Sequence, residues 1–123
     1  MKKRIALFAS GTGSNVVNFI NYFKNSETIE IALVLSNNNE APVLGKAEKS
    51  GIETVAITNS AAANGPFMLS LLASYNVHFI VLAGYLRFVP KELITEYEGN
   101  LVNIHPSLLP KYGGKGMYGA KVH

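Results

Sequence analysis

Cysteine and aspartate are both absent from this sequence of 123 residues, and its eight acidic side chains are all glutamate. A chain without cysteine can form no disulfide, no thiolate metal site and no cysteine nucleophile, and such a composition fits a reducing compartment. No apolar run approaches the ~20 residues that a helix needs to span a bilayer. The apolar part of the opening MKKRIALFAS is also too short for a secretory signal. We therefore expect a cytoplasmic protein that makes no contact with membranes.

Dense clusters of positive charge are lacking as well. Eleven lysines and arginines stand against eight glutamates, which gives a formal charge of +3. The short basic segments MKKR and KYGGK are typical of solvated surface. A nucleic-acid-binding face needs a stripe of lysine and arginine, so we expect no nucleic-acid partner. The mild positive charge is compatible with an anionic small molecule.

Five continuous apolar runs rich in Val, Ile, Leu and Phe occur along the chain, at residues 4–9, 29–36, 53–57, 77–84 and 101–104. Continuous rather than alternating runs are typical of strands that are covered on both faces. The segments between them predict helices, at residues 14–24, 40–50, 66–74 and 90–97. One side of the first helix carries an apolar stripe, as a helix packed on a sheet requires; its residues are Val16, Val17, Phe19, Ile20 and Phe23. Strands that alternate with helices through short links form right-handed crossovers. The sequence therefore predicts one α/β domain over residues 1–123, with a doubly wound, Rossmann-like parallel sheet.

Single residues refine these bounds. Asn39 is expected to cap the second helix and Gly51 to end it, while Pro90 suits the first turn of the fourth helix. His78 falls inside the fourth strand, where we expect a structural role. The last apolar run, at residues 101–104, would be an edge strand, and a bare apolar edge favours pairing or aggregation. We therefore expect the native product to be longer than this chain, and the sequence leaves a homodimer open.

The glycine-rich segment ASGTGSN, residues 9–15, links the first strand to the first helix. Its two glycines allow tight or left-handed backbone. The N–H groups of Gly13, Ser14 and Asn15 would point outward at the positive end of the helix dipole, where anions bind. An anion site and an ordinary tight turn with Ser14 as N-cap are both compatible with this segment. Val16 stands where a dinucleotide fingerprint needs its third glycine, so a single phosphate is the expected anion.

Asn103 and His105 lie at the end of the fifth apolar run. Residues two apart in an extended segment share a face, so the two side chains would point the same way. An amide can donate a hydrogen bond to a developing oxyanion, and an imidazole can move protons at neutral pH. A lone histidine in a loop more often satisfies nearby carbonyls. The neighbouring amide and the position at a strand end, where ligands gather in parallel sheets, favour the catalytic interpretation.

Three segments together resemble one known family: SGTGSN after the first strand, IVLAGYLRFVP after the fourth and NIHPSLLPKY after the fifth. They occur in the order and roughly at the spacing of the phosphoribosylglycinamide formyltransferases, enzymes of the folate-dependent purine pathway. The resemblance extends over the whole chain. Members of that family transfer a formyl group from 10-formyltetrahydrofolate to the amine of glycinamide ribonucleotide. The resemblance implies this activity, with these two small molecules as substrates, and it implies no metal.

The resemblance also implies roles for single residues. The ribonucleotide phosphate would be held by Gly13, Ser14 and Asn15. The folate site would be formed largely by main-chain groups around the pterin, from Leu86, Arg87, Phe88 and Val89, together with Asn103. His105 would be the proton donor, and Asn103 would bind the formyl oxygen. Without the family, Arg87 would be interpreted as a surface cation and Phe88 as a core aromatic.

Two features depart from the family pattern. The family's third catalytic group is an aspartate some tens of residues after the histidine, and this chain reaches His123 without any aspartate. The nearest acidic residues would face solvent and are poor substitutes; they are Glu92, Glu96 and Glu98. Family members commonly place a basic folate contact near residues 58–67, where Asn64 and Gly65 stand here. The sequence thus predicts the N-terminal part of a formyltransferase, truncated after its Asn-x-His motif.

Other functions stay open beside this one. The chain could be a catalytically incomplete fragment that binds a ribonucleotide or phosphate, in which case binding would occur without turnover. A related folate-using hydrolase carries a regulatory domain ahead of its catalytic domain, for which Met1 leaves no room. A formyltransferase acting on tRNA lacks GTGSN and has a tRNA-binding domain, for which this chain has neither the charge nor the length.

Overall fold

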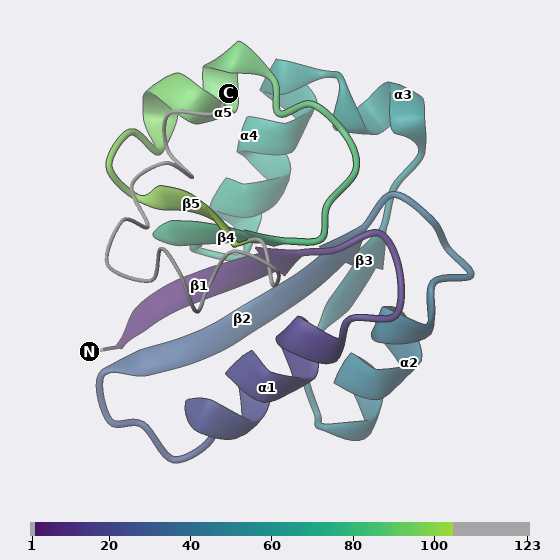
Figure 1. The fold of residues 1–123 in the computed structure, drawn as a ribbon. Helices are drawn as coiled ribbons and strands as arrows, with labels where there is room; N and C mark the ends of the chain where they lie inside the picture. Colours follow the sequence, from purple (N-terminus) through teal and green to yellow (C-terminus); the bar gives the residue numbers. More distant parts are fainter. Residues whose placement is uncertain (1, 105–123) are drawn as a thin grey trace.

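The computed structural model describes residues 2–104, which form a five-stranded parallel sheet with helices on both faces (Figure 1). The elements along the chain are β1 (Lys3–Phe8), α1 (Ser14–Tyr22), β2 (Ile29–Ser36), α2 (Pro42–Lys49), β3 (Thr54–Ala56), α3 (Asn59–Ala62), α4 (Gly65–Ser74), β4 (Phe79–Ala83), α5 (Lys91–Glu96) and β5 (Leu101–Ile104). The strand order is β3-β2-β1-β4-β5, and each neighbouring pair is parallel. The predicted doubly wound α/β fold is therefore confirmed.

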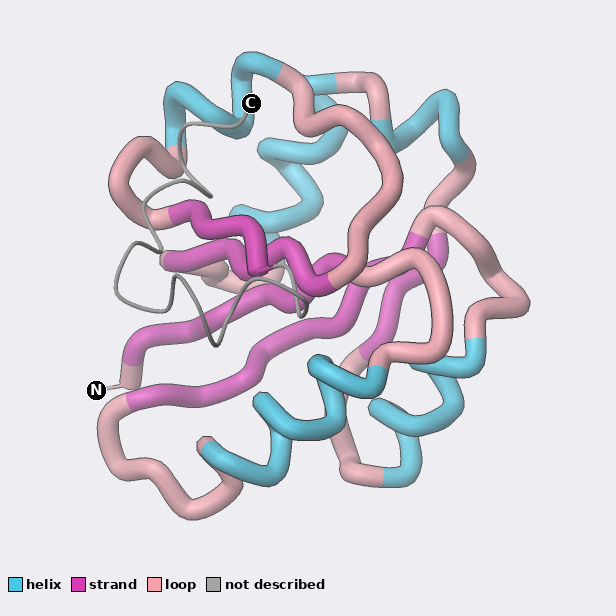
Figure 2. The backbone as a smooth tube through the Cα atoms, viewed as in Figure 1, coloured by secondary structure: helices cyan, strands magenta, loops and turns pink. Residues whose placement is uncertain are grey.

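The two faces of the sheet carry different helices. Helices α1 and α2 cover one face, and α3, α4 and α5 cover the other, as the cyan segments on either side of the magenta strands show (Figure 2). Strand β1 supplies both cores, because successive side chains of a strand point to opposite faces. Ile5 and Leu7 pack with α1 and α2, whereas Ala6 and Phe8 pack with α4 and α5. This double burial explains why the strand is apolar at every position from Ile5 to Phe8.

Helix α1 packs on the sheet through one apolar stripe. Val16 and Ile20 are buried, and Val17, Phe19 and Phe23 are half-buried beside them. Residues three and four apart lie on one side of a helix, so the predicted stripe is confirmed. Each fully buried side chain of this size contributes about 1.5–3 kcal/mol to folding. The stripe therefore fixes α1, and with it the loop that leads into its first turn.

Helix α2 begins later than expected. It starts at Pro42, whose fixed φ suits a first turn, and Ala41 precedes it as N-cap without a side-chain bond. Asn39 is not the cap, so that prediction is wrong. Its neighbour Asn38 instead accepts a hydrogen bond from the Glu40 N–H at 3.0 Å within the loop, and this local turn uses up the chain that would have extended the helix. Gly51 follows the helix end with φ 80°, as expected.

The short helix α3 was not expected from the sequence. The Thr58 side chain accepts a hydrogen bond from the Ala61 N–H at 3.0 Å and so caps this single turn. Helix α4 follows immediately and is capped in the same way, because Asn64 Oδ1 accepts from the Phe67 N–H at 2.9 Å. Pro90 directly precedes α5 as its N-cap residue.

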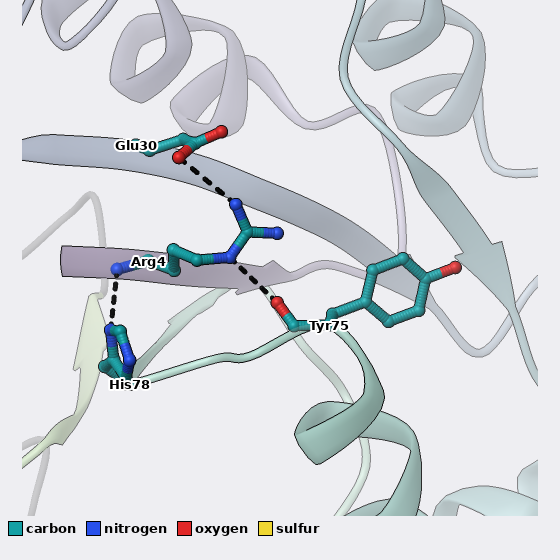
Figure 3. Close-up of polar contacts among 4 residues, drawn as sticks. All are labelled: Arg4, Glu30, Tyr75 and His78. Atoms are coloured by element: carbon teal, nitrogen blue, oxygen red, sulfur yellow. Dashed lines mark hydrogen bonds and ion pairs between the residues drawn. The ribbon is translucent and has the colours of Figure 1, made fainter. Parts of the chain in front are cut away.

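Arg4 ties three segments together at the amino edge of the sheet (Figure 3). Its main-chain N–H donates to His78 Nδ1 at 3.1 Å, and its Nε donates to the Tyr75 carbonyl at 2.9 Å. Its guanidinium also pairs with Glu30 at 3.1 Å. His78 lies just before β4 rather than inside the strand, and it holds β1 in both directions, because its main-chain N–H donates to the Arg4 carbonyl at 2.8 Å while its ring Nδ1 accepts from the Arg4 N–H. The expected structural role of this histidine therefore has a defined geometry.

Candidate functional site

The candidate site lies at the edge of the sheet where the five parallel strands end (Figure 1). The glycine segment follows β1, the segment from Gly84 to Pro90 follows β4, and Asn103 belongs to β5. The three segments that carry the family resemblance thus reach one edge, where open parallel sheets bind ligands. His105, the predicted proton donor, lies outside the described residues.

The glycine loop turns into α1 at Gly13, which has φ 74° and is the N-cap residue. Ser14 is therefore the first residue of the helix rather than its cap, and no side chain caps the first turn. The first intrahelical bond runs from the Val17 N–H to the Gly13 carbonyl at 2.9 Å. The N–H groups of Ser14 and Asn15 precede this bond and have no partner within the helix. The geometry favours an anion site over a side-chain-capped turn.

Helix α2 contacts the glycine loop through two hydrogen bonds and one close side-chain contact. The Val43 N–H donates to the Gly11 carbonyl at 3.2 Å, and Lys46 Nζ donates to the Thr12 carbonyl at 2.9 Å. The Val43 side chain packs so closely on Gly13 that it leaves no space for a Cβ there. Sequence analysis missed Lys46, because a lysine on a solvated helix gives no signal of its own. The structure brings its positive charge beside the loop predicted to bind phosphate.

The segment after β4 forms one wall of a hollow of about 260 Å³. Its lining contains all five residues predicted for the folate site, joined by two more, and they are Leu82, Tyr85, Leu86, Arg87, Phe88, Val89 and Asn103. Asn103 stands beside Leu82 in the β4–β5 register. Phe88 is 97% exposed and Leu86 is 81% exposed, so the alternative interpretation of Phe88 as a core aromatic is wrong. Large apolar side chains that are exposed to solvent and line a hollow are typical of a binding surface.

Tyr85 lies on the inner side of this hollow and was not predicted. Its ring packs edge-on against Phe8 with centroids 5.2 Å apart. Its hydroxyl is buried and has no hydrogen-bond partner among the described residues. Burial raises the pKa of Tyr85 to about 12, and the nearby Arg87 only partly opposes this shift. The phenol is therefore neutral at physiological pH. An aromatic residue among apolar residues is ordinarily interpreted as part of the core, so no sequence pattern pointed to this hydroxyl.

Asn103 is half-buried at the third of the four positions of β5. Leu101, two residues earlier on the same face, is buried in the core beneath α4 and α5. Val102 and Ile104 point to the opposite face. This alternation directs Asn103 to the side on which the hollow lies.

The residues named where the sequence departs from the family pattern lie in different places. Asn64 caps α4, so its side-chain oxygen is already engaged. Glu96 and Glu98 are exposed as expected, but Glu92 is half-buried and its carboxylate packs on Gly65. Glu92 was expected to face solvent, and that prediction is wrong because α5 packs against the start of α4. Within residues 2–104, no three side chains of the metal-ligating types His, Cys, Asp and Glu come together.

The described helices are too short or too polar to cross a membrane.

The sequence profile described as formyl transferase matches residues 3–123. The chain belongs to the formyl transferase family. The match includes the glycine loop, the wall of the hollow and the Asn-x-His segment, so the residues that carry the resemblance all fall within it.

Individual family members are similar over the same region. A chloroplastic phosphoribosylglycinamide formyltransferase of Vigna unguiculata is 37% identical over 129 residues, which cover 99% of this chain and 41% of the relative. The chain thus spans about two fifths of that protein. A crystal structure of glycinamide ribonucleotide transformylase 1 from Geobacillus kaustophilus superposes with a TM-score of 0.80 at 31% identity, covering 99% of this chain and 68% of that one. The Brucella melitensis phosphoribosylglycinamide formyltransferase gives 0.81 at 36%, with coverages of 91% and 61%.

Proposed function

We propose that this formyl transferase chain transfers a formyl group from 10-formyltetrahydrofolate to the amine of glycinamide ribonucleotide, and that residues 1–123 form one N-terminal domain that binds both substrates. The observation that carries the proposal is the single hollow whose lining unites Asn103 with the segment from Leu86 to Val89. The segment that follows β4 and the neighbouring strand β5 meet there. The names of the relatives, which are formyltransferases acting on this ribonucleotide, support the same reaction.

The hollow fits part of a folate rather than the whole molecule. Pockets for drug-sized ligands measure roughly 300–1,000 Å³, and this one measures about 260 Å³. It therefore suits a single ring system such as the pterin. Leu82, Leu86 and Val89 provide apolar walls, and the main chain from Leu86 to Val89 would supply carbonyl groups, and N–H groups other than that of Leu86, for the ring nitrogens. The rest of the folate would extend beyond the described residues.

Formyl transfer exchanges one bond for another. The bond from the formyl carbon to the folate nitrogen breaks, a bond to the ribonucleotide amine forms, and one proton passes from the amine to the folate nitrogen. Asn103 would donate from its amide to the formyl oxygen, where negative charge develops. His105 would move the proton. Removal of one such oxyanion donor typically costs about 10²–10³ in rate.

The ribonucleotide phosphate would bind at Gly13, Ser14 and Asn15. The N–H groups of the first turn of α1, which no side chain among residues 2–104 caps, support this assignment, because they lie at the positive end of the helix dipole. Lys46 adds a positive charge through its contact with Thr12. The phosphate would therefore meet main-chain donors and one lysine rather than an arginine fork, and no metal enters the proposal.

The proposal extends to location and assembly. We place the protein in the cytoplasm with small molecules as its partners, and not nucleic acid or membranes. The cysteine-free composition supports a reducing compartment, and fractionation of cells followed by immunodetection tests the location. A homodimer is compatible with β5, whose outer side pairs with no strand among residues 2–104.

The direct test is formyl transfer by the full chain, followed by mass spectrometry of the ribonucleotide product. We expect formylated product, and we expect His105→Ala to abolish it while leaving ribonucleotide affinity nearly unchanged. Ribonucleotide binding without turnover in the unsubstituted chain would favour the incomplete phosphate-binding fragment. Equal loss of binding and turnover in His105→Ala would contradict the role given to that histidine.

A further inference from the structure

Ser10 lies where three loops of the candidate site meet. Its hydroxyl accepts a hydrogen bond from the Leu86 N–H at 2.9 Å and donates to Asn37 Oδ1 at 2.6 Å. Asn37 in turn donates from Nδ2 to Asn59 Oδ1 at 3.1 Å. This string of bonds, from Leu86 through Ser10 and Asn37 to Asn59, connects the segments that follow β4, β1, β2 and β3.

The direction of the first bond in the string is fixed by chemistry. A main-chain N–H can only donate, so the Ser10 oxygen accepts from Leu86 and its single proton is left for Asn37. Each group that accepts on one side and donates on the other polarises the next, which strengthens the string. The main-chain N–H of Ser10 also donates to the Gly84 carbonyl at 3.1 Å. Ser10 therefore holds the segment after β4 at two points.

Within the segment that Ser10 holds, the Tyr85 ring packs on Phe8, but Leu86 has no such anchor of its own. The Leu86 side chain is mostly exposed, so core packing does not determine where its main chain lies. Leu86 is the first of the predicted folate-site residues that line the hollow. Gly13, the first of the residues proposed to hold the phosphate, follows Ser10 by three residues along the chain. One hydroxyl thus lies between the proposed sites of both substrates.

We propose that Ser10 is a positioning residue that fixes the Leu86 main chain for the folate and couples the folate site to the ribonucleotide site. This inference rests on the proposed function. Binding of the ribonucleotide orders the glycine loop, and the Ser10 hydroxyl passes that order to the wall of the hollow. The coupling is reciprocal, so each substrate tightens the binding of the other by the same factor.

The test is Ser10→Ala in the full chain, with 10-formyltetrahydrofolate titrated in the presence and absence of glycinamide ribonucleotide. A typical loss of one hydrogen bond predicts roughly two- to tenfold weaker folate binding. We also expect the coupling factor to fall toward one, with KM for the folate raised and kcat nearly unchanged. Ser10→Thr keeps a hydroxyl and is expected to restore both quantities.

Ser26→Ala is the matched control. The Ser26 hydroxyl also accepts main-chain bonds, from the Thr28 and Ile29 N–H groups at 3.1 and 3.0 Å, but at the opposite end of β2. Its loss removes comparable bonds far from the site. Folate affinity and coupling are therefore expected to stay at the unsubstituted values, which separates positioning from a general loss of stability.

A measurement without ligands separates this inference from the proposed function. Hydrogen exchange at the Leu86 amide is expected to quicken in Ser10→Ala and to stay unchanged in Ser26→Ala. Unchanged Leu86 exchange and unchanged coupling in Ser10→Ala would overturn the inference alone. If the unsubstituted chain binds neither substrate while Leu86 exchange still responds to Ser10→Ala, the proposed function fails and the coupling fails with it.

Discussion

Gly13 and Val43 are in such close contact that a Cβ at Gly13 would overlap both the Cβ and a methyl group of Val43. Gly13 also has φ 74°, a left-handed conformation that other residues adopt at a cost. Two separate constraints therefore require glycine where the chain enters α1. The contact with Val43 is imposed by α2, so the glycine loop depends on a helix that lies 30 residues further along the chain.

Gly13→Ala is expected to lower the free energy of unfolding by about 2–4 kcal/mol, because the left-handed strain and the overlap with Val43 add. Gly11→Ala is the matched control in the same loop. Gly11 has open space around its Cβ position and no positive φ, so its substitution should change stability by less than about 1 kcal/mol. Urea denaturation measures both, and equal losses would show that the contact with Val43 is not the constraint.

Asn64 occupies the region where a basic folate contact is common in the family, and the structure gives it another task. As the cap of α4 it accepts a bond from the Phe67 N–H, so Asn64→Ala should cost about 1 kcal/mol of stability. Folate affinity should stay the same. Asn25→Ala, at an exposed loop residue, serves as control. A fall in folate affinity with unchanged stability would identify Asn64 as a folate contact instead.

Tyr85 predicts a pH dependence at the alkaline end. Burial favours the neutral phenol, which raises its folded pKa from 10.0 to about 12. A raised pKa contributes stability that is complete below pH 10 and is lost as pH rises from 10 to 12. Tyr85→Phe cannot ionise there, so its free energy of unfolding should fall less over this window than that of the unsubstituted chain.

The same variant is informative at neutral pH. The Tyr85 hydroxyl has no partner among residues 2–104, so its removal should leave stability equal or raise it by up to about 1 kcal/mol. Tyr22→Phe is the control, because Tyr22 is 81% exposed and should behave as the unsubstituted chain at every pH. A stability loss of more than about 1 kcal/mol in Tyr85→Phe would mean that the hydroxyl does have a partner.

Much of the architecture could be predicted because it rests on repeated local patterns. The continuous apolar runs specified the parallel sheet, and the stripe on α1 specified its buried side. Helix α3 escaped prediction because a single turn is stabilised by one Thr58 hydrogen bond rather than by a periodic pattern. The start of α2 was misplaced because Asn38, rather than Asn39, makes the side-chain bond in the loop.

Some features of the candidate site could likewise be predicted from the sequence, and others could not. The residues predicted for the folate site lie together because strand ends in a parallel sheet share one edge. Phe88 could not be assigned to solvent from sequence, since aromatic residues are usually buried. The bonds among Ser10, Asn37 and Leu86 join loops from three strands, and such long-range polar contacts leave no spacing pattern in the sequence. These are the features for which coordinates were needed.

The central claim is tested most directly by the kcat of formyl transfer in Asn103→Ala, measured beside Asn100→Ala. Both residues are asparagines near β5, but Asn103 lines the hollow whereas Asn100 is exposed before the strand. The account predicts a loss of about 10²–10³ in kcat for Asn103→Ala and a near-normal value for Asn100→Ala. A kcat for Asn103→Ala within a few-fold of the unsubstituted chain would contradict it.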